Sequence, residues 1–179
     1  TVRRIYTAIG FTDVSGVGIE PEGEFSRTGE TIDPDQDRDL MKLLEVGTLC
    51  NDSQLIYENK SWRATGDLTE AAIVVAAAKA GINKEELDTT RERIAEIPFE
   101  SERKRMSTIH PLEKEGFIVC VKGAPEILLD LSTRYLAGGK EMELTDKARE
   151  SFLKANEEMA SKALRILGIA YSSLRELPK

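Results

Sequence analysis

The residues best suited to chemistry lie where a buried strand is expected to end, at Lys122. The apolar run 118–121 calls for burial, so the lysine is carried to the edge of the core. Gly123 lets the backbone turn and a ligand approach closely, and Pro125 and Glu126 suit the first turn of a helix. An ammonium group in this position can serve an anionic or aromatic ligand. The alternative is a solvated lysine at an ordinary strand–helix turn.

A second candidate group opens an alanine-rich helix expected from Leu68 to Ala80. Asp67 or Thr69 is suited to cap this helix, and Glu70 could close a capping box. Carboxylates and free N–H groups at a helix start can also receive ribose hydroxyls, an amine or a phosphate. The alternative is that these residues only start the helix.

An aromatic residue and two cationic segments complete the candidates. Phe99 stands at an expected strand end, ahead of the basic run 103–105 that contains Lys104, with Met106 next. Such an aromatic suits stacking on a nucleobase whose phosphates meet nearby cations. Arg165, at a helix–strand junction, can neutralise a helix end or reach a phosphate. For Phe99 the alternative is a core aromatic followed by a solvated turn.

Composition and missing motifs exclude several classes of protein. The chain has 179 residues, enough for one domain, and its 25 basic and 32 acidic residues give a net charge of −7, which argues against a nucleic-acid partner. The sequence contains no P-loop, G-x-G-x-x-G, G-x-S-x-G or H-E-x-x-H motif. His110 is the only histidine, and Cys50 and Cys120 are 70 positions apart, so we expect buried, reduced thiols. We therefore assign no catalytic and no metal-binding residue.

The pattern of elements predicts an α+β fold, with a central, mostly antiparallel β-sheet flanked by helices. The sequence is expected to break at 60–66, between a strand and a helix, and Asp33 to Asp35 are expected to cap the helix 36–50. Helices are expected at 36–50, 68–80, from 83, at 125–131 and at 146–164, and strands at 2–10, 24–28, 55–58, 94–99, 105–110, 117–121 and 165–172, with a hairpin at 135–144.

Taken together and in this order, these segments resemble the nucleotide-binding (N) domain of the P-type cation-transporting ATPases, closest to the calcium-pump-like group. The Lys-Gly-Ala-Pro-Glu motif at 122–126 is highly specific when Phe99 and the 103–107 run lie upstream. The resemblance covers nearly the whole chain. It implies an ATP site in which Phe99 stacks on adenine and Lys122 lines the base of the adenine pocket beside Gly123. It also places Asp67, Thr69 and Glu70 on the polar side, Met106 near the ring, and Lys104 and Arg165 on the phosphate side.

The resemblance implies a wider role for residues 1–179, as a single nucleotide-binding domain of a larger membrane ATPase. Mg-ATP would be the cofactor, with Mg²⁺ held mainly by other domains, and the phosphorylation and actuator domains would be the partners. The segment Asp-Lys-Thr-Gly-Thr, which carries the phosphorylated aspartate in the family, does not occur here. The chain is thus expected to be an excised, monomeric piece of the cytoplasmic part of a membrane protein that binds ATP without splitting it.

Two positions depart from the family pattern, and they leave alternatives open. Leu68 stands where the family often has proline, and Ser101 where many calcium pumps carry an arginine, so a phosphate contact is either missing or passes to Arg103 or Arg105. One alternative function is a regulatory or protein-interaction domain that has lost nucleotide binding. Another is a self-sufficient ATP-using enzyme such as a small kinase, against which the missing P-loop argues.

Overall fold

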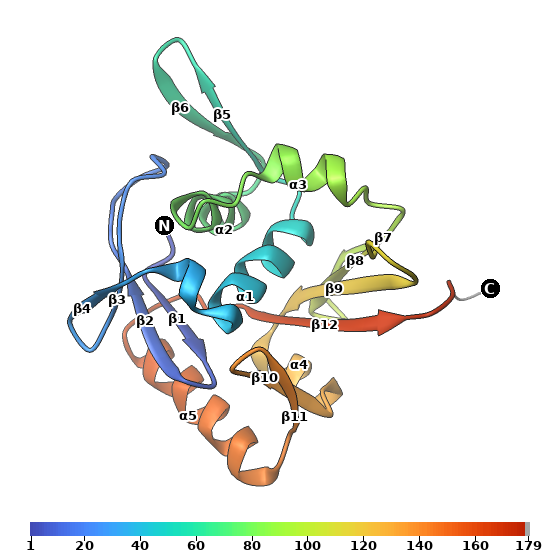
Figure 1. Cartoon of the computed structure of the whole chain (residues 1–179). Helices are drawn as coiled ribbons and strands as arrows, with labels where there is room; N and C mark the ends of the chain where they lie inside the picture. Colours follow the sequence, from blue (N-terminus) through green and yellow to red (C-terminus); the bar gives the residue numbers. More distant parts are fainter. Residues whose placement is uncertain (178–179) are drawn as a thin grey trace.

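The computed structural model describes residues 1–177 and places helix α1 (Arg38–Leu49) between two antiparallel sheets (Figure 1). Leu40 and Leu44 of this helix belong to one buried cluster, with the first sheet and α2. Leu49 and the neighbouring Cys50 belong to a second cluster, with the other sheet. One helix therefore supplies side chains to both cores, and its two ends face different partners.

The first sheet has the strand order β1-β2-β3-β4, and neighbours in the chain are neighbours in the sheet. Ile5, Val14 and Phe25 fill its inner face against α1 and α2. On another side, Tyr6 meets Phe152 of α5 edge-on, with ring centroids 5.4 Å apart. The elements of this half are β1 (Arg4–Thr7), β2 (Gly10–Val14), β3 (Phe25–Arg27), β4 (Glu30–Ile32) and α5 (Asp146–Ser161).

The second sheet has the order β12-β9-β8-β7 and carries the lysine-bearing strand near its centre. Met106, Lys122 and Ile169 stand opposite one another on three adjacent strands. The edge strand β7 pairs irregularly, with a register shift between Ile97 and Glu100. The strands of this sheet are β7 (Ala95–Glu100), β8 (Arg105–Pro111), β9 (Phe117–Gly123) and β12 (Gly168–Leu174).

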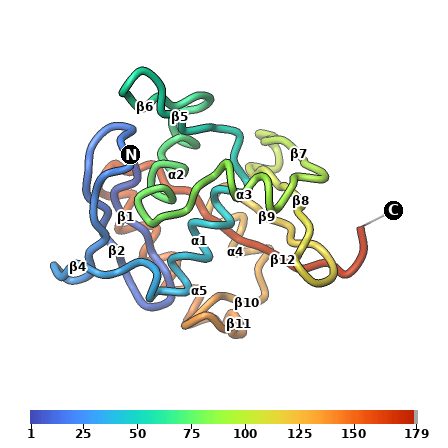
Figure 2. Tube along the Cα trace, turned by 45° about the horizontal axis from the view of Figure 1, so that its top comes forward, coloured from blue at the N-terminus to red at the C-terminus, as the bar shows by residue number. Residues whose placement is uncertain are grey.

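The remaining elements lie around these two sheets. Helix α2 packs along α1, while the β5–β6 hairpin projects from the body beyond α2 in both views (Figure 1, Figure 2). Two of its aromatic rings, those of Tyr57 and Trp62, lie 5.0 Å apart. These elements are the 3₁₀ helix η1 (Pro34–Gln36), β5 (Gln54–Glu58), β6 (Ser61–Thr65), α2 (Leu68–Lys79), α3 (Lys84–Thr90), α4 (Pro125–Leu131), β10 (Arg134–Ala137) and β11 (Lys140–Glu143).

The expected α+β class is confirmed, but several details of the prediction are wrong. The single strand expected at 2–10 is two strands, β1 and β2, and β4 was not expected. The antiparallel strands form two four-stranded sheets and separate hairpins, not one central sheet. The expected break at 60–66 is the strand β6. Asp33 caps only the 3₁₀ turn, and Asp37 caps α1 by accepting the N–H groups of Asp39 and Leu40 at 3.1 and 3.0 Å.

Candidate nucleotide site

Lys122 is buried near the end of β9, with only 6% of its surface exposed. Its ammonium group forms an ion pair with Oε1 of Glu70, which lies in the first turn of α2. The interpretation of Lys122 as a solvated side chain at an ordinary turn is therefore wrong. A buried lysine held by a single carboxylate at a strand end is the uncommon arrangement that binding sites use.

The start of α2 carries three polar side chains, those of Asp67, Thr69 and Glu70, and its N-cap hydrogen bonds are satisfied within the chain. Asp67 is the N-cap residue, and its Oδ1 accepts the N–H groups of Thr69 at 2.8 Å and Glu70 at 3.2 Å. These two hydrogen bonds lower the pKa of Asp67, so it remains a carboxylate. Glu70 does not close a capping box, because its second oxygen accepts the N–H of Asp52 at 3.0 Å.

Arg165 reaches the same helix start from the far end of the chain. It lies between α5 and β12, and its Nη1 donates to Oγ1 of Thr69 at 2.9 Å. The contact is exposed, which leaves the rest of the guanidinium open to solvent. One continuous chain of hydrogen bonds thus connects five residues that lie between positions 67 and 165 of the sequence. These are Arg165, Thr69, Asp67, Glu70 and Lys122.

Gly123 lies tightly against the turn that precedes β8. A Cβ atom at Gly123 would stand 2.4 Å from the carbonyl oxygen of Lys104, which accepts the N–H of Ala124 at 3.0 Å. Lys104 itself has a left-handed backbone, with φ of 52°, and its N–H donates to Glu100 at 2.7 Å. A glycine is therefore required at position 123 because the backbone at Lys104 leaves no room for a Cβ atom. The sequence alone did not indicate this constraint. The Lys104 side chain itself is exposed.

Met106 lies on β8, next to β9, and Phe99 lies on the edge strand β7 beyond it, and the two side chains differ in burial. Met106 is directly opposite Lys122, is 3% exposed, and packs in the core with Cys50. Phe99 is 61% exposed on the edge strand, so its interpretation as a core aromatic is wrong. Two strand spacings separate β7 from β9, which sets the two backbones about 10 Å apart.

Sequence reasoning missed the turn that follows α1. Asn51 donates from Nδ2 to the carbonyl of Glu70 at 2.9 Å, and the hydroxyl of Ser53 donates to the carbonyl of Asp67 at 3.0 Å. In the sequence, the Asn-Asp-Ser run at 51–53 indicates only the end of a helix. The only signal in the sequence is an asparagine and a serine two positions apart, ahead of a helix that starts with polar residues. This signal becomes informative only when the turn after α1 is known to contact the start of α2.

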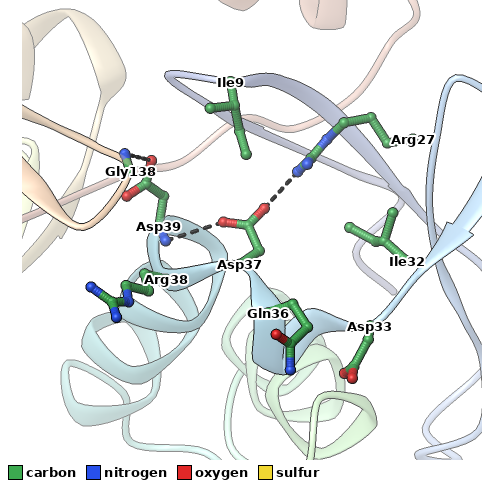
Figure 3. Close-up of a pocket in the computed structure, with 9 residues that line it drawn as sticks. All are labelled: Ile9, Arg27, Ile32, Asp33, Gln36, Asp37, Arg38, Asp39 and Gly138. Carbon is green, nitrogen blue, oxygen red and sulfur yellow. Dashed lines mark hydrogen bonds and ion pairs between the residues drawn. The ribbon is translucent and has the colours of Figure 1, made fainter.

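Two cavities lie away from Phe99 and Lys122. The larger, of about 520 Å³, opens between the first sheet and the start of α1 (Figure 3). Its two buried acids are already used, because Asp37 binds Arg27 and caps α1, and Asp39 accepts the N–H groups of Gly138 and Gly139. Saturated carboxylates of this kind hold elements together, so we do not place the site there. The smaller cavity, of about 240 Å³, is lined by Asn51, Asp52, Gln54, Lys84, Asp88 and Arg93.

The fold and this site define an α+β domain with a polar helix start paired to a buried lysine and with an exposed aromatic on the edge strand of the same sheet as the lysine. Residues 39–179 match the family model described as P-type ATPase, cytoplasmic domain N. The chain belongs to this family, as its motifs indicated.

Curated relatives extend the match over nearly the whole chain. The chain is 30% identical over 175 residues to a calcium-transporting ATPase of Bacillus subtilis, covering 98% of the chain and 20% of that protein. It is 36% identical to the cation-transporting ATPase pma1 of Synechocystis (95% and 19%) and 31% identical to the bovine calcium-transporting ATPase type 2C member 1 (95% and 18%). The chain therefore spans about a fifth of the length of these relatives. Among residues 1–177, no helix is both long and apolar enough to span a bilayer.

Proposed function

We propose that this domain binds ATP through its adenine ring and presents the γ-phosphate to the phosphorylation domain of a cation-transporting P-type ATPase, with calcium as the transported ion. Family membership and the names of the relatives support this function. The nine residues proposed for the site are Asp67, Thr69, Glu70, Phe99, Lys104, Met106, Lys122, Gly123 and Arg165.

One observation carries the proposal: Phe99 is exposed on the edge strand of the sheet in which Lys122, two strands away, is buried. Exposing most of a benzyl group forgoes hydrophobic stabilisation, and burying an ammonium group costs desolvation. A bound ligand would offset both costs if its flat aromatic ring covers Phe99 and the polar edge of that ring contacts the Lys122–Glu70 pair. Stacking of a base on a protein aromatic contributes about 1–3 kcal/mol.

The phosphates would extend toward the exposed cations, Lys104 and Arg165. Phosphoryl transfer requires the γ-phosphate, Mg²⁺ and the acceptor carboxylate to be aligned, and this domain supplies positioning. Within the described residues, no three His, Cys, Asp or Glu side chains come together as a metal site. As the family resemblance implies, Mg²⁺ would be held mainly by other domains, and domain closure would bring the phosphorylation domain to the nucleotide together with the actuator domain.

The isolated chain should bind adenine nucleotides weakly, because it grips mainly the base. We expect dissociation constants from below to about 1 mM, or roughly −4 to −6 kcal/mol. ATP, ADP and AMP should bind with similar affinity, and UTP should bind much less. Titration of the ¹⁵N-labelled chain, followed by amide NMR shifts, measures each affinity and maps the residues that respond.

The variant Phe99→Ala tests the stacking contact against a matched control. It should weaken ATP binding roughly 5- to 150-fold, which corresponds to the loss of 1–3 kcal/mol of stacking. Tyr57→Ala is the control, because Tyr57 is 59% exposed but lies on the β5–β6 hairpin. Unchanged ATP binding by Phe99→Ala, or equal binding of UTP and ATP, would overturn the proposal and favour a docking domain without nucleotide binding.

A further inference from the structure

The turn that follows α1 holds the start of α2 in place, and the Lys122–Glu70 pair depends on it. We propose that Asn51 is a positioning residue of the nucleotide site: through the main chain of α2 it sets where the Glu70 carboxylate meets Lys122. This inference rests on the proposed function for its link to ATP, but its geometry stands on contacts within the chain.

Three hydrogen bonds connect the turn to α2. Asn51 donates to the carbonyl of Glu70 at 2.9 Å, the N–H of Asp52 donates to the Glu70 carboxylate at 3.0 Å, and Ser53 donates to the carbonyl of Asp67 at 3.0 Å. Asn51 and Ser53 are 1% and 0% exposed. The turn therefore grips both the main chain of α2 and the functional carboxylate.

The turn itself is fixed by an internal hydrogen bond and by hydrogen bonds from Arg93. Asn51 accepts the N–H of Ser53 at 2.9 Å, which fixes the amide orientation and leaves Nδ2 to donate. Arg93 donates to the carbonyl of Asn51 at 2.9 Å and to the carboxylate of Asp52 at 2.6 Å. The side chain of Asn51 is thus fixed by Ser53 and its main chain by Arg93, so the hydrogen bond from Asn51 to Glu70 holds α2 at a defined position.

Apolar packing alone would not fix α2 along its axis. The helix is rich in alanine and valine, and its buried residues are Ala71, Ile73, Val74, Val75, Ala76 and Ala77. Apolar contacts are non-directional, so the hydrogen bonds at the start of the helix add a constraint on its axial position that packing does not supply. Gly66 agrees with this close contact, because a Cβ there would lie 2.7 Å from the Ser53 hydroxyl.

Asn51→Ala and Ser53→Ala test the proposal, with Gln54→Ala as the matched control. Gln54 follows the same turn, but its side chain donates to Asp88 of α3 and not to α2. Two measurements are made on each variant at a temperature well below the midpoint of its thermal unfolding. The first is the dissociation constant for ATP. The second is the ¹H–¹⁵N signal of the Lys122 ammonium group, which is visible when burial and pairing slow its exchange with water.

Asn51→Ala should weaken ATP binding roughly two- to tenfold, the net value of one hydrogen bond, and should broaden or shift the Lys122 signal. A purely structural residue would lower the unfolding temperature and leave both measurements unchanged, and that result would overturn the proposal. If Asn51→Ala does not fold, Ser53→Ala decides by the same measurements. If the wild type binds no ATP, the proposed function fails, and the Lys122 signal alone decides whether Asn51 positions the pair.

Discussion

Lys122 and Glu70 are the residues in which burial and charge conflict most directly. Their side chains are only 7% and 17% exposed. Removing two charges from water costs several kcal/mol, and their attraction offsets this only with good geometry and further hydrogen bonds, such as the one from Asp52 to Glu70. Such a pair adds little net stability compared with apolar residues. Its presence at a strand end agrees with the binding role proposed for this pair.

The variants Lys122→Met and Glu70→Gln test the coupling of this pair. Each should lower the free energy of unfolding by about 2–4 kcal/mol, because each leaves the other group buried without its partner. The double variant should lose about 1–3 kcal/mol less than the sum of the two single losses. Urea unfolding followed by circular dichroism gives all four values, and strictly additive losses would show that the two side chains do not interact.

Gly123→Ala should be costly for a reason unrelated to backbone conformation. Its Cβ would stand 2.4 Å from the Lys104 carbonyl oxygen, so the turn that follows Phe99 must shift. We expect a loss of about 3 kcal/mol in unfolding free energy, from overpacking, together with weaker ATP binding. Gly138→Ala is the control: its φ of 61° adds about 1 kcal/mol of strain, and no atom crowds the new Cβ. Equal ATP affinities in the two variants would contradict this role.

At the scale of elements, His110 joins β8 to the segment that follows α3. The ring is 1% exposed, Nδ1 lies 2.9 Å from the carbonyl of Arg91, and Nε2 lies 2.9 Å from the hydroxyl of Thr108. A neutral ring suits this pair, because it donates to a carbonyl from Nδ1 and accepts a hydroxyl proton at Nε2. Burial lowers the pKa of His110, and the Arg93 and Lys84 charges lower it further, while the hydrogen bond to the Arg91 carbonyl and the Asp88 carboxylate oppose this shift.

The sign of the resulting pH dependence follows from protonation of the unfolded chain. The folded pKa lies below the ordinary value of 6.5, so the unfolded chain binds a proton first as the pH falls. Stability is thus full above pH 6.5 and declines below it, by at most about 1.4 kcal/mol per pH unit for this one group. The difference in unfolding free energy between wild type and His110→Gln, measured from pH 7.5 to 5, should shrink toward acid. A constant difference would show that His110 does not titrate.

The element boundaries show what the sequence could and could not predict. Helix α2 and the β10–β11 hairpin follow from local signals, namely a cap and glycine at the turn. Strand β6 was missed because Asn59 and Lys60 make its turn with φ of 51° and 63°, and only the asparagine gives a turn signal. For the site, local motifs single out Lys122 and Glu70 separately, but the two residues are 52 positions apart. Their contact depends on long-range packing, which periodicity does not encode.

At the scale of the whole molecule, the second core and the candidate site share their elements. Cys50 and Cys120 are both 0% exposed in the cluster that also contains Met106. Burial raises the pKa of both thiols, that of Cys120 to about 12. We expect a thiol reagent to reach them when α1 separates from the second sheet, an opening that would also disturb the residues around Lys122. Thiol reactivity should therefore report the same opening that destroys the nucleotide site.

ATP should protect both cysteines by a factor set by its own affinity. A ligand that binds only the closed form lowers the open population by 1 + [L]/Kd, so ATP at ten times its Kd should slow labelling by iodoacetamide about elevenfold. The reaction is followed by mass spectrometry under conditions where closing is faster than labelling, so that the rate tracks the open population. UTP at matched ionic strength should give no protection. If ATP binds by NMR yet labelling keeps its rate, the thiols react through a local opening that leaves the site intact, and the coupling between core and site would be refuted.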